Sequence, residues 1–149
     1  METSRPRSGR ETARSVGPVG YALAHAVRAH RTDLTHRLAL LGLHPGQELI
    51  VVDLHGHPGS TQAELVARMG IEQPTIAKAV SRMERSGFVQ RVQDDADRRV
   101  VRLRLTEQGE EAVDGVMAAW HEAEAAVTER LSAADRRELL RLLERIGDA

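Results

Sequence analysis

The sequence of 149 residues contains no cysteine. Disulfide bonds, thiolate metal sites and cysteine-based redox switching are therefore excluded. The chain also has no apolar run that approaches the roughly 20 residues of a membrane-spanning helix, and its first residues lack the apolar segment of a signal peptide. We therefore expect a protein that works in the cytoplasm and does not enter membranes.

Aromatic residues are almost as scarce, since the chain has one Phe, one Tyr and one Trp. A hydrophobic core must then consist mainly of aliphatic side chains packed between helices. Base stacking on aromatic rings, a usual way to hold single-stranded nucleic acid, is disfavoured for the same reason. The sequence also shows no glycine-rich phosphate cradle and no nucleophile motif, so it predicts no cofactor.

Seven histidines raise the question of a metal site or of acid–base catalysis. The closest grouping is Asp53, His55 and His57, but Gly56 and Pro58 beside them indicate a turn. Metal-binding spacings such as H-x-x-x-H do not accompany them. We interpret these residues as solvated loop histidines, and we predict that the protein holds no metal and is not an enzyme.

The net charge of -1 does not by itself suggest a nucleic-acid partner, because phosphate contacts dominate affinity for DNA. The charge is unevenly distributed, however. Residues 75–104 contain eight Lys or Arg against four Asp or Glu, whereas residues 107–149 contain five against eleven, which gives +4 and -6. Such a split can arise by chance on solvated faces, but it favours a DNA-reading surface in the basic segment.

Two short helices joined by a tight turn are predicted at the start of this region. Thr61 and Glu64 have the spacing at which a hydroxyl and a carboxylate each accept a hydrogen bond from an exposed backbone N–H group, so a helix is expected to begin there. Gly70 supplies the backbone freedom that a sharp turn requires. A second helix begins near Gln73 and ends at Gly87, with Pro74 tolerated in its first turn.

The two faces of the second helix differ in character. Apolar residues at helical spacing predict its buried side, namely Ile76, Val80 and Met83. The outer side carries groups that can donate to base edges and phosphates, as a recognition helix in the major groove must: Gln73, Thr75, Lys78, Ser81 and Arg82.

A two-stranded hairpin follows, because residues 89–105 alternate between apolar and polar side chains around a polar cluster. Asp97, Arg98 and Arg99 fall at or beside its tip. Arginine can enter a narrow minor groove there, and a nearby carboxylate can hold its guanidinium in place. The hairpin is thus predicted to be the wing of a winged helix.

These features resemble the MarR family of bacterial winged-helix regulators. The residues that match the family's helix-turn-helix pattern in register are Thr61, Gln62, Glu64, Leu65, Gly70, Thr75, Glu84, Gly87 and Val89. Those that match its wing pattern are Asp97, Arg99, Leu103, Leu105 and Thr106. The resemblance extends from about residue 20 to the end, and it implies that Arg99 inserts into the minor groove while Asp97 orients it.

Two departures from the family pattern limit what can be transferred. Pro74 stands where the family often has serine, so a hydroxyl and an N–H group are missing from the first turn of the reading helix. Glu72 stands where a short capping residue is common and is a weak cap. The operator sequence therefore cannot be copied from the family.

The segments that flank the lobe carry long apolar stripes. We expect one long helix from about Gly20 to Gly42, and two more after Thr106, the second opened by Ser132 with Asp135. Such stripes need a partner, and the family uses these helices to dimerise. Residues 47–54 read locally as a strand because they contain a β-branched run, but the resemblance implies a helix, which we adopt.

The predicted fold is mainly α with a small β-wing. Residues 1–17 are expected to be a disordered basic arm, and residues 18–149 a single MarR-like domain. Within this domain, the winged helix-turn-helix DNA-binding lobe covers residues 45–105, and dimerisation helices cover 18–42 and 106–149. The predicted DNA-binding residues are Thr61, Gln62, Gln73, Thr75, Lys78, Ser81, Arg82, Asp97, Arg98 and Arg99.

The predicted function is that of a homodimeric, ligand-responsive repressor of transcription on a pseudo-palindromic double-stranded DNA operator. The alternative is a winged-helix module that makes protein contacts without DNA. The resemblance also implies a crevice for a small anionic or aromatic effector. His25, His30 or His44 would offer the ligand a charged or hydrogen-bonding end, and Trp120 or Tyr21 an apolar wall, although tryptophan at helical spacing is more often a core residue.

Overall fold

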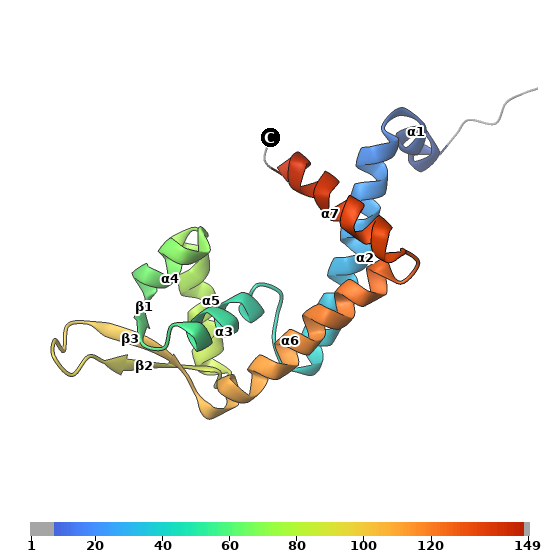
Figure 1. Ribbon diagram of the computed structural model, residues 1–149. Coiled ribbons are helices and arrows are strands. Elements are labelled where there is room, and N and C mark those ends of the chain that lie inside the picture. The colour runs from blue at the N-terminus through green and yellow to red at the C-terminus, as the bar shows by residue number, and fades with distance from the viewer. Residues whose placement is uncertain (1–7, 148–149) are drawn as a thin grey trace, which may run out of the picture. The chain divides into compact units, whose positions relative to one another are not determined.

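A computed structural model describes residues 8–147 of the protein (Figure 1). The elements in chain order are α1 (Gly9–Val16), α2 (Pro18–Leu40), α3 (Gln47–Gly56), β1 (Ser60–Thr61), α4 (Gln62–Met69), α5 (Gln73–Arg85), β2 (Val89–Gln93), β3 (Val101–Leu105), α6 (Glu107–Thr128) and α7 (Ala133–Gly147). The fold is mainly helical with one small antiparallel sheet, as the sequence predicts. None of the helices within residues 8–147 combines the length and apolar character needed to cross a membrane.

The chain forms two compact units. Among the described residues, one unit contains residues 8–33 together with 122–147, and the other contains Leu34–His121. The second unit holds the helix-turn-helix and the wing. It is larger than the predicted lobe of residues 45–105, because the last turns of α2 and the first part of α6 belong to it.

Part of the N-terminal segment is helical, which differs from the expected disordered arm of residues 1–17. Helix α1 begins after Ser8, whose hydroxyl accepts from the Glu11 N–H at 3.3 Å while the Glu11 carboxylate accepts from the Ser8 N–H at 2.8 Å. This reciprocal cap satisfies two backbone donors locally, so a short helix forms without buried residues. Residues 1–7 of the predicted arm lie outside the described residues.

Helix α3 confirms the helical assignment of residues 47–54. Side chains of its first turn satisfy N–H groups of the turn before it, since the Gln47 amide oxygen accepts from the His44 N–H at 2.8 Å and the Glu48 carboxylate from the Gly46 N–H at 2.6 Å. Ile50, Val51 and Leu54 are fully buried. Burial of this apolar stripe therefore outweighs the β propensity of the local sequence.

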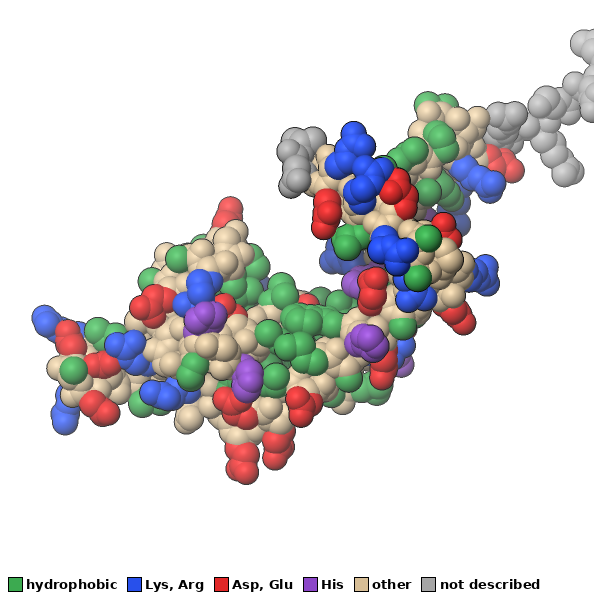
Figure 2. All heavy atoms as spheres, in the orientation of Figure 1, with side chains coloured by type: hydrophobic (Ala, Val, Ile, Leu, Met, Phe, Trp, Pro, Cys, Tyr) green, Lys and Arg blue, Asp and Glu red, His purple; other side chains and the backbone are tan. Residues whose placement is uncertain are grey.

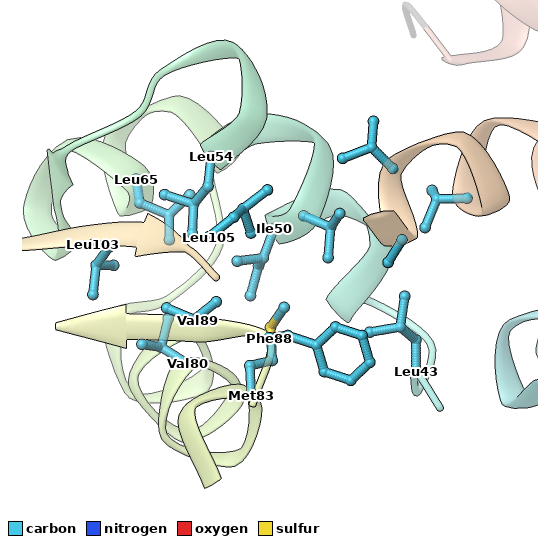
Figure 3. Packing of buried hydrophobic residues seen from close by; sticks show 14 of the residues in the cluster. Leu43, Ile50, Leu54, Leu65, Val80, Met83, Phe88, Val89, Leu103 and Leu105 are labelled. Atoms are coloured by element: carbon cyan, nitrogen blue, oxygen red, sulfur yellow. The ribbon is translucent and has the colours of Figure 1, made fainter. Parts of the chain in front are cut away.

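The core of the second unit lies between the sheet and its helices (Figure 3). Its fully buried aliphatic residues are Leu38, Leu43, Ile50, Val51, Leu54, Leu65, Ile76, Val80, Met83, Val89, Leu103 and Val116. Phe88 packs among them and is 3% exposed. The core is aliphatic apart from this ring and the half-buried Trp120, as the scarcity of aromatic residues requires.

The sheet has three strands in the order β1-β3-β2, all antiparallel. In the wing hairpin, Val89 pairs with Leu105 and Gln93 with Val101. The additional strand β1 pairs Ser60 with Leu103 and Thr61 with Arg102, so the entry to the helix-turn-helix is joined to the wing by backbone hydrogen bonds. The sequence did not predict this strand.

Both C-terminal helices begin where the sequence predicts. The Thr106 hydroxyl accepts from the Gly109 N–H at 3.1 Å at the start of α6. At the start of α7, the Ser132 hydroxyl accepts from the Asp135 N–H at 3.2 Å, and the Asp135 carboxylate accepts from the Ser132 N–H at 3.2 Å.

Candidate nucleic-acid interface

The first helix of the helix-turn-helix is fixed by the predicted capping box. The Glu64 N–H donates to the Thr61 hydroxyl at 3.2 Å, and the Thr61 N–H donates to the Glu64 carboxylate at 2.7 Å. The hydrogen bond from the Thr61 backbone to the Glu64 carboxylate, and after it one from the Thr61 side chain, lower the pKa of Glu64. The helix ends at Gly70, which adopts φ 62°, so the turn uses the left-handed conformation for which glycine is suited.

The second helix, α5, is placed by its buried side. Ile76, Val80 and Met83 are all buried, as predicted. Glu72 gives no side-chain cap, and its backbone carbonyl instead accepts from the N–H groups of Thr75 at 3.0 Å and Ile76 at 3.2 Å. The structure leaves the predicted outer face exposed to solvent: Gln73, Thr75, Lys78, Ser81 and Arg82.

The wing tip places an arginine in solvent and holds it with a carboxylate. The Arg99 guanidinium donates from Nε to Asp97 Oδ1 at 3.1 Å and from Nη2 to Oδ2 at 3.3 Å. The Arg99 side chain is 91% exposed and that of Asp97 44%. The side-chain bond from Arg99, with a further one from its N–H group, lowers the pKa of Asp97. Arg98 is also exposed, and Figure 2 shows basic and acidic side chains together at the end of the hairpin.

The base of the wing is braced by Arg91, which the sequence reasoning did not single out. Its Nε donates to the Glu84 carboxylate of α5 at 3.1 Å, and its Nη2 donates to the Gln62 amide oxygen of α4 at 3.4 Å. One strand residue thus joins both helices of the helix-turn-helix. Gln62, a predicted DNA contact, takes part in this internal bracing.

The loop between β2 and β3 is held by a second pair that the sequence reasoning missed. Asp94 accepts from Arg102 Nε, and Arg102 Nη1 donates to the Gly59 carbonyl at 3.0 Å. The hydrogen bond from Arg102, together with those from the Asp97 and Ala96 N–H groups, lowers the pKa of Asp94 to about 2. The only sequence signal was the polar cluster itself, because the contacts join residues 8 and 43 positions apart.

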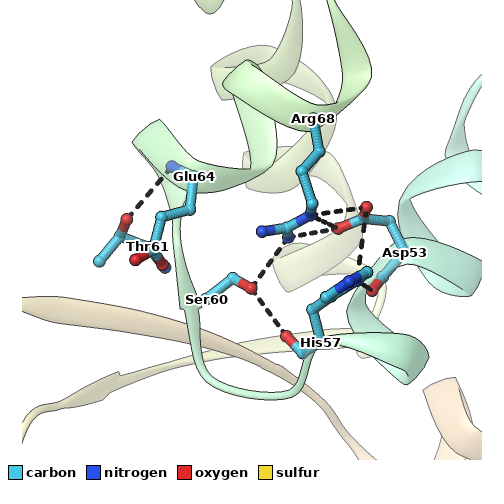
Figure 4. A network of polar contacts seen from close by, with 6 residues as sticks. All are labelled: Asp53, His57, Ser60, Thr61, Glu64 and Arg68. Carbon is cyan, nitrogen blue, oxygen red and sulfur yellow. Dashed lines mark hydrogen bonds and ion pairs between the residues drawn. The ribbon is translucent and has the colours of Figure 1, made fainter.

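A polar network ties α3, β1 and α4 together (Figure 4). Arg68 donates to both carboxylate oxygens of Asp53, the shortest contact being 2.6 Å, and its Nη2 also donates to the Ser60 hydroxyl at 2.9 Å. His57 Nδ1 lies 3.0 Å from the Asp53 carbonyl oxygen. Asp53 is therefore engaged in an ion pair that positions α4.

His55, the other histidine near Asp53, contacts a different helix. Its Nδ1 lies 2.7 Å from the Glu110 carboxylate of α6. No group of three or more His, Asp or Glu side chains within the described residues 8–147 is placed to hold a metal ion.

The predicted effector residues divide between the two units. His25 and His30 belong to the first unit, while His44 and Trp120 belong to the second. Trp120 is half-buried and packs against the core. His44 borders a hollow of about 450 Å³ beside α5, whose other lining residues include Thr75, Lys78 and Arg82. His44 therefore lies near three predicted DNA-binding residues.

Solved structures of several transcription regulators share this architecture. The model of the MarR family matches residues 43–101. A probable transcriptional regulator from Pseudomonas aeruginosa is 26% identical, with 86% of this chain and 96% of that chain covered and a TM-score of 0.73. A Cys-to-Ser variant of MarR from E. coli, solved with operator DNA, has a TM-score of 0.74 at 18% identity, covering 90% and 96% of the two chains.

The PcaV transcriptional regulator from Streptomyces coelicolor, solved with its natural ligand, has a TM-score of 0.72 at 23% identity, covering 100% and 99% of the two chains. At these lower identities the likeness shows a common fold. The family model covers the helix-turn-helix and the wing up to the start of β3, which are the elements whose geometry suits DNA. The chain therefore resembles the MarR family of winged-helix transcription regulators: its residues 43–101 match the family model, and its fold is that of the solved regulators.

Proposed function

We propose that the protein is a homodimeric repressor that binds a pseudo-palindromic operator and is released from it by a small ligand. The observation that carries the proposal is the presence, on one lobe, of an exposed polar face of α5 and an exposed arginine held by a carboxylate at the wing tip. A helix fits the major groove, and arginine favours a narrow minor groove. One lobe can therefore read both grooves.

The proposed contacts follow from these exposures. We assign the major groove to Gln73, Thr75, Lys78, Ser81 and Arg82, and the minor groove to Arg99 oriented by Asp97. Thr61 and Gln62 at the start of α4, and Arg98 beside the wing tip, add contacts to the DNA backbone. A repressor of this kind acts on chromosomal DNA, so the cytoplasmic location expected from the sequence remains part of the proposal.

Dimerisation is supported by an apolar surface in the first unit. Helix α7 exposes Leu139, Leu142, Leu143 and Ile146, which are 42%, 41%, 38% and 53% exposed. Together with residues near the start of α2 they line a groove of about 830 Å³, whose lining is apolar apart from Arg145. Monomeric proteins rarely leave so continuous an apolar surface in water. We assign a second copy of the chain to this surface, since a two-fold dimer places two reading helices about 34 Å apart.

The dimer is tested by sedimentation of the wild type and two variants. Leu142→Asp introduces a charge into the groove and is expected to give monomers. Leu140→Asp is the matched control, because Leu140 is also on α7 and 59% exposed but does not line the groove. A monomeric wild type, or equal effects of the two variants, contradicts the assignment.

Release by a ligand is supported by the hollow beside His44. A small acidic or aromatic molecule bound there would lie against Thr75, Lys78 and Arg82, which we assign to DNA. The histidine offers it a hydrogen bond or, when protonated, a positive charge. Its effect on DNA affinity can be no larger than its preference for the released state.

DNA binding is tested by a mobility-shift titration of the protein against its own upstream promoter region and an unrelated duplex of equal length, at two salt concentrations. We expect tight, sequence-dependent binding that salt weakens. Weak and equal binding to both duplexes contradicts recognition of this promoter. If selection from a random duplex library also recovers no preferred site, sequence-specific recognition is refuted and the protein-contact alternative stands.

Two variants test the assigned roles. Arg99→Ala is expected to weaken binding by about 1–3 kcal/mol. If Lys78 touches a phosphate, Lys78→Ala is expected to weaken binding on all sequences and to reduce the salt slope by about 1. Arg130→Ala is the control, since it removes the same charge from an exposed position between α6 and α7. Wild-type affinity in Arg99→Ala contradicts the role assigned to the wing.

A further inference from the structure

The loop at the end of the wing is organised around one carboxylate, that of Asp94. Its Oδ1 accepts from the N–H groups of Ala96 at 2.9 Å and Asp97 at 3.0 Å. The Asp94 N–H donates to the Val100 carbonyl at 3.0 Å, which closes the loop. The Asp94 side chain is only 16% exposed. The hydrogen bonds of Asp94, which directly follows β2, therefore give the loop a defined shape.

Arg102 connects this carboxylate to the rest of the lobe. It donates from Nε to Asp94 and from Nη1 to the carbonyl of Gly59, at 3.0 Å, in the turn before β1. The Gly59 N–H in turn donates to the Leu103 carbonyl at 3.0 Å. The positive charge of Arg102 also contributes to the lowered pKa of Glu64, which caps α4. One guanidinium thus joins the wing loop to the entry of the helix-turn-helix.

We propose that Arg102 and Asp94 are positioning residues that set the direction of Arg99 for the minor groove. The contacts form a continuous series: Arg102 holds Asp94, Asp94 holds the N–H group of Asp97, and Asp97 holds the Arg99 guanidinium. A loop fixed before binding loses less conformational entropy when DNA arrives. This inference rests on the proposed function, because it concerns how the wing arginine reaches DNA.

Arg102 and Asp94 do not have the exposure expected of residues that contact DNA directly. Arg102 is 37% exposed and its guanidinium has two partners within the lobe, whereas Arg99 is 91% exposed. Loss of Arg102 should therefore act through Arg99. The expected consequence is a loss of minor-groove reading while the major-groove face of α5 still binds.

The test compares Arg102→Leu with Arg104→Leu, after an operator has been found with the wild type. Both arginines lie on the same face of β3, two residues apart, and each variant removes one positive charge. Arg104 is exposed and makes no ion pair with the residues that the structure describes, so it is the matched control. Asp94→Asn is a second variant that removes the charge of the carboxylate and keeps its shape. Circular dichroism and thermal unfolding establish that each variant is folded.

The readout is binding to two operators. In one of them the adenines under the wing are replaced by 2,6-diaminopurine, which adds an amino group to the minor-groove edge and leaves the major-groove pairing face in place. Wild type and Arg104→Leu are expected to lose about tenfold in affinity on this operator. Arg99→Ala, Arg102→Leu and Asp94→Asn are expected to bind both operators within about twofold. The double variant Arg99→Ala/Arg102→Leu should bind no more than about twofold more weakly than Arg99→Ala.

The proposal is overturned if Arg102→Leu distinguishes the two operators as the wild type does, whatever its overall affinity. It is also overturned if the double variant shows the full product of the two single losses, because Arg102 would then act independently of Arg99. Failure of the wild type to prefer any duplex would instead refute the proposed function. Insensitivity of the wild type to diaminopurine would refute the minor-groove role of Arg99 and this proposal with it.

Discussion

Replacing Gly109 with alanine is expected to destabilise the protein, although the same replacement in a helix usually stabilises it. In an ordinary helix position, alanine is favoured over glycine by about 1 kcal/mol. Gly109 is buried near the start of α6, where a Cβ would overlap the backbone carbonyl oxygen of Phe88 and lie 3.1 Å from Leu105 Cβ. The Phe88 carbonyl also accepts the Thr106 N–H at 3.0 Å, so it cannot turn away without losing that bond.

The magnitude follows from these contacts. Overpacking a site that must shift costs about 1–3 kcal/mol, and a broken backbone hydrogen bond costs about 1 kcal/mol more. The gain in helix propensity offsets about 1 kcal/mol. Gly109→Ala is therefore expected to lower the free energy of unfolding by about 1–3 kcal/mol.

Urea denaturation of three alanine variants tests the reasoning. Gly56 lies in α3, where the structure places no other described atom within 4 Å of an added Cβ, and Gly56→Ala should stabilise by about 0.5–1 kcal/mol. At Gly115 the Cβ would lie 2.8 Å from Leu41 Cδ2, the end of a flexible side chain, so the effect should be small. A Gly109→Ala protein as stable as the wild type, or equal losses in all three variants, would refute the argument.

Three further perturbations follow from the polar contacts of the lobe. Thr61→Ala removes one half of the capping box of α4 and should cost about 1 kcal/mol in chemical denaturation, whereas an unchanged midpoint would show that the cap is dispensable. Arg68→Met leaves Asp53 without its bidentate partner and should lower the free energy of unfolding by about 1–2 kcal/mol. The double variant Asp53→Asn/Arg68→Met should lose no more unfolding free energy than the two single variants lose together. The pKa of Asp94 is lowered from 3.8 to about 2, so its ion pair contributes stability above pH 4 that is lost as the pH falls toward 2. The difference in unfolding free energy between wild type and Asp94→Asn should therefore be full at pH 6 and narrow through this window, and a difference independent of pH would contradict the pairing.

Features of the fold that depend on local sequence were predictable, and those that depend on distant pairs were not. Helix α5 follows from the spacing of Ile76, Val80 and Met83, and the start of α4 follows from Thr61 and Glu64, because each signal lies within one helix. Strand β1 has two residues, and its pairing with β3 joins positions more than forty residues apart, so no local pattern marks it. Helix α1 was missed for a different reason, since a polar composition conceals the reciprocal cap at its start.

The candidate site shows the same division. The exposed side chains of α5 and the wing tip could be predicted from helical and strand periodicity. The residues that brace them could not, because Arg91, Asp94 and Arg102 are polar residues among other polar residues in the sequence. Their partners become evident only where the strands, the wing loop and the helices meet.

The ion pairs also change how the basic charge of the lobe should be counted. Arg68, Arg91 and Arg102 are each paired with a carboxylate of the lobe. Within residues 8–147 the structure shows no such pair for Lys78, Arg82 and Arg98, which are exposed on α5 and the wing. A net charge calculated from the sequence counts all these residues equally. DNA phosphates, however, are neutralised by cations that are not already paired within the protein. Loss of Lys78, Arg82 or Arg98 should therefore reduce the salt dependence of DNA binding, because fewer counterions are released. Loss of a bracing arginine should change affinity mainly through the shape of the lobe.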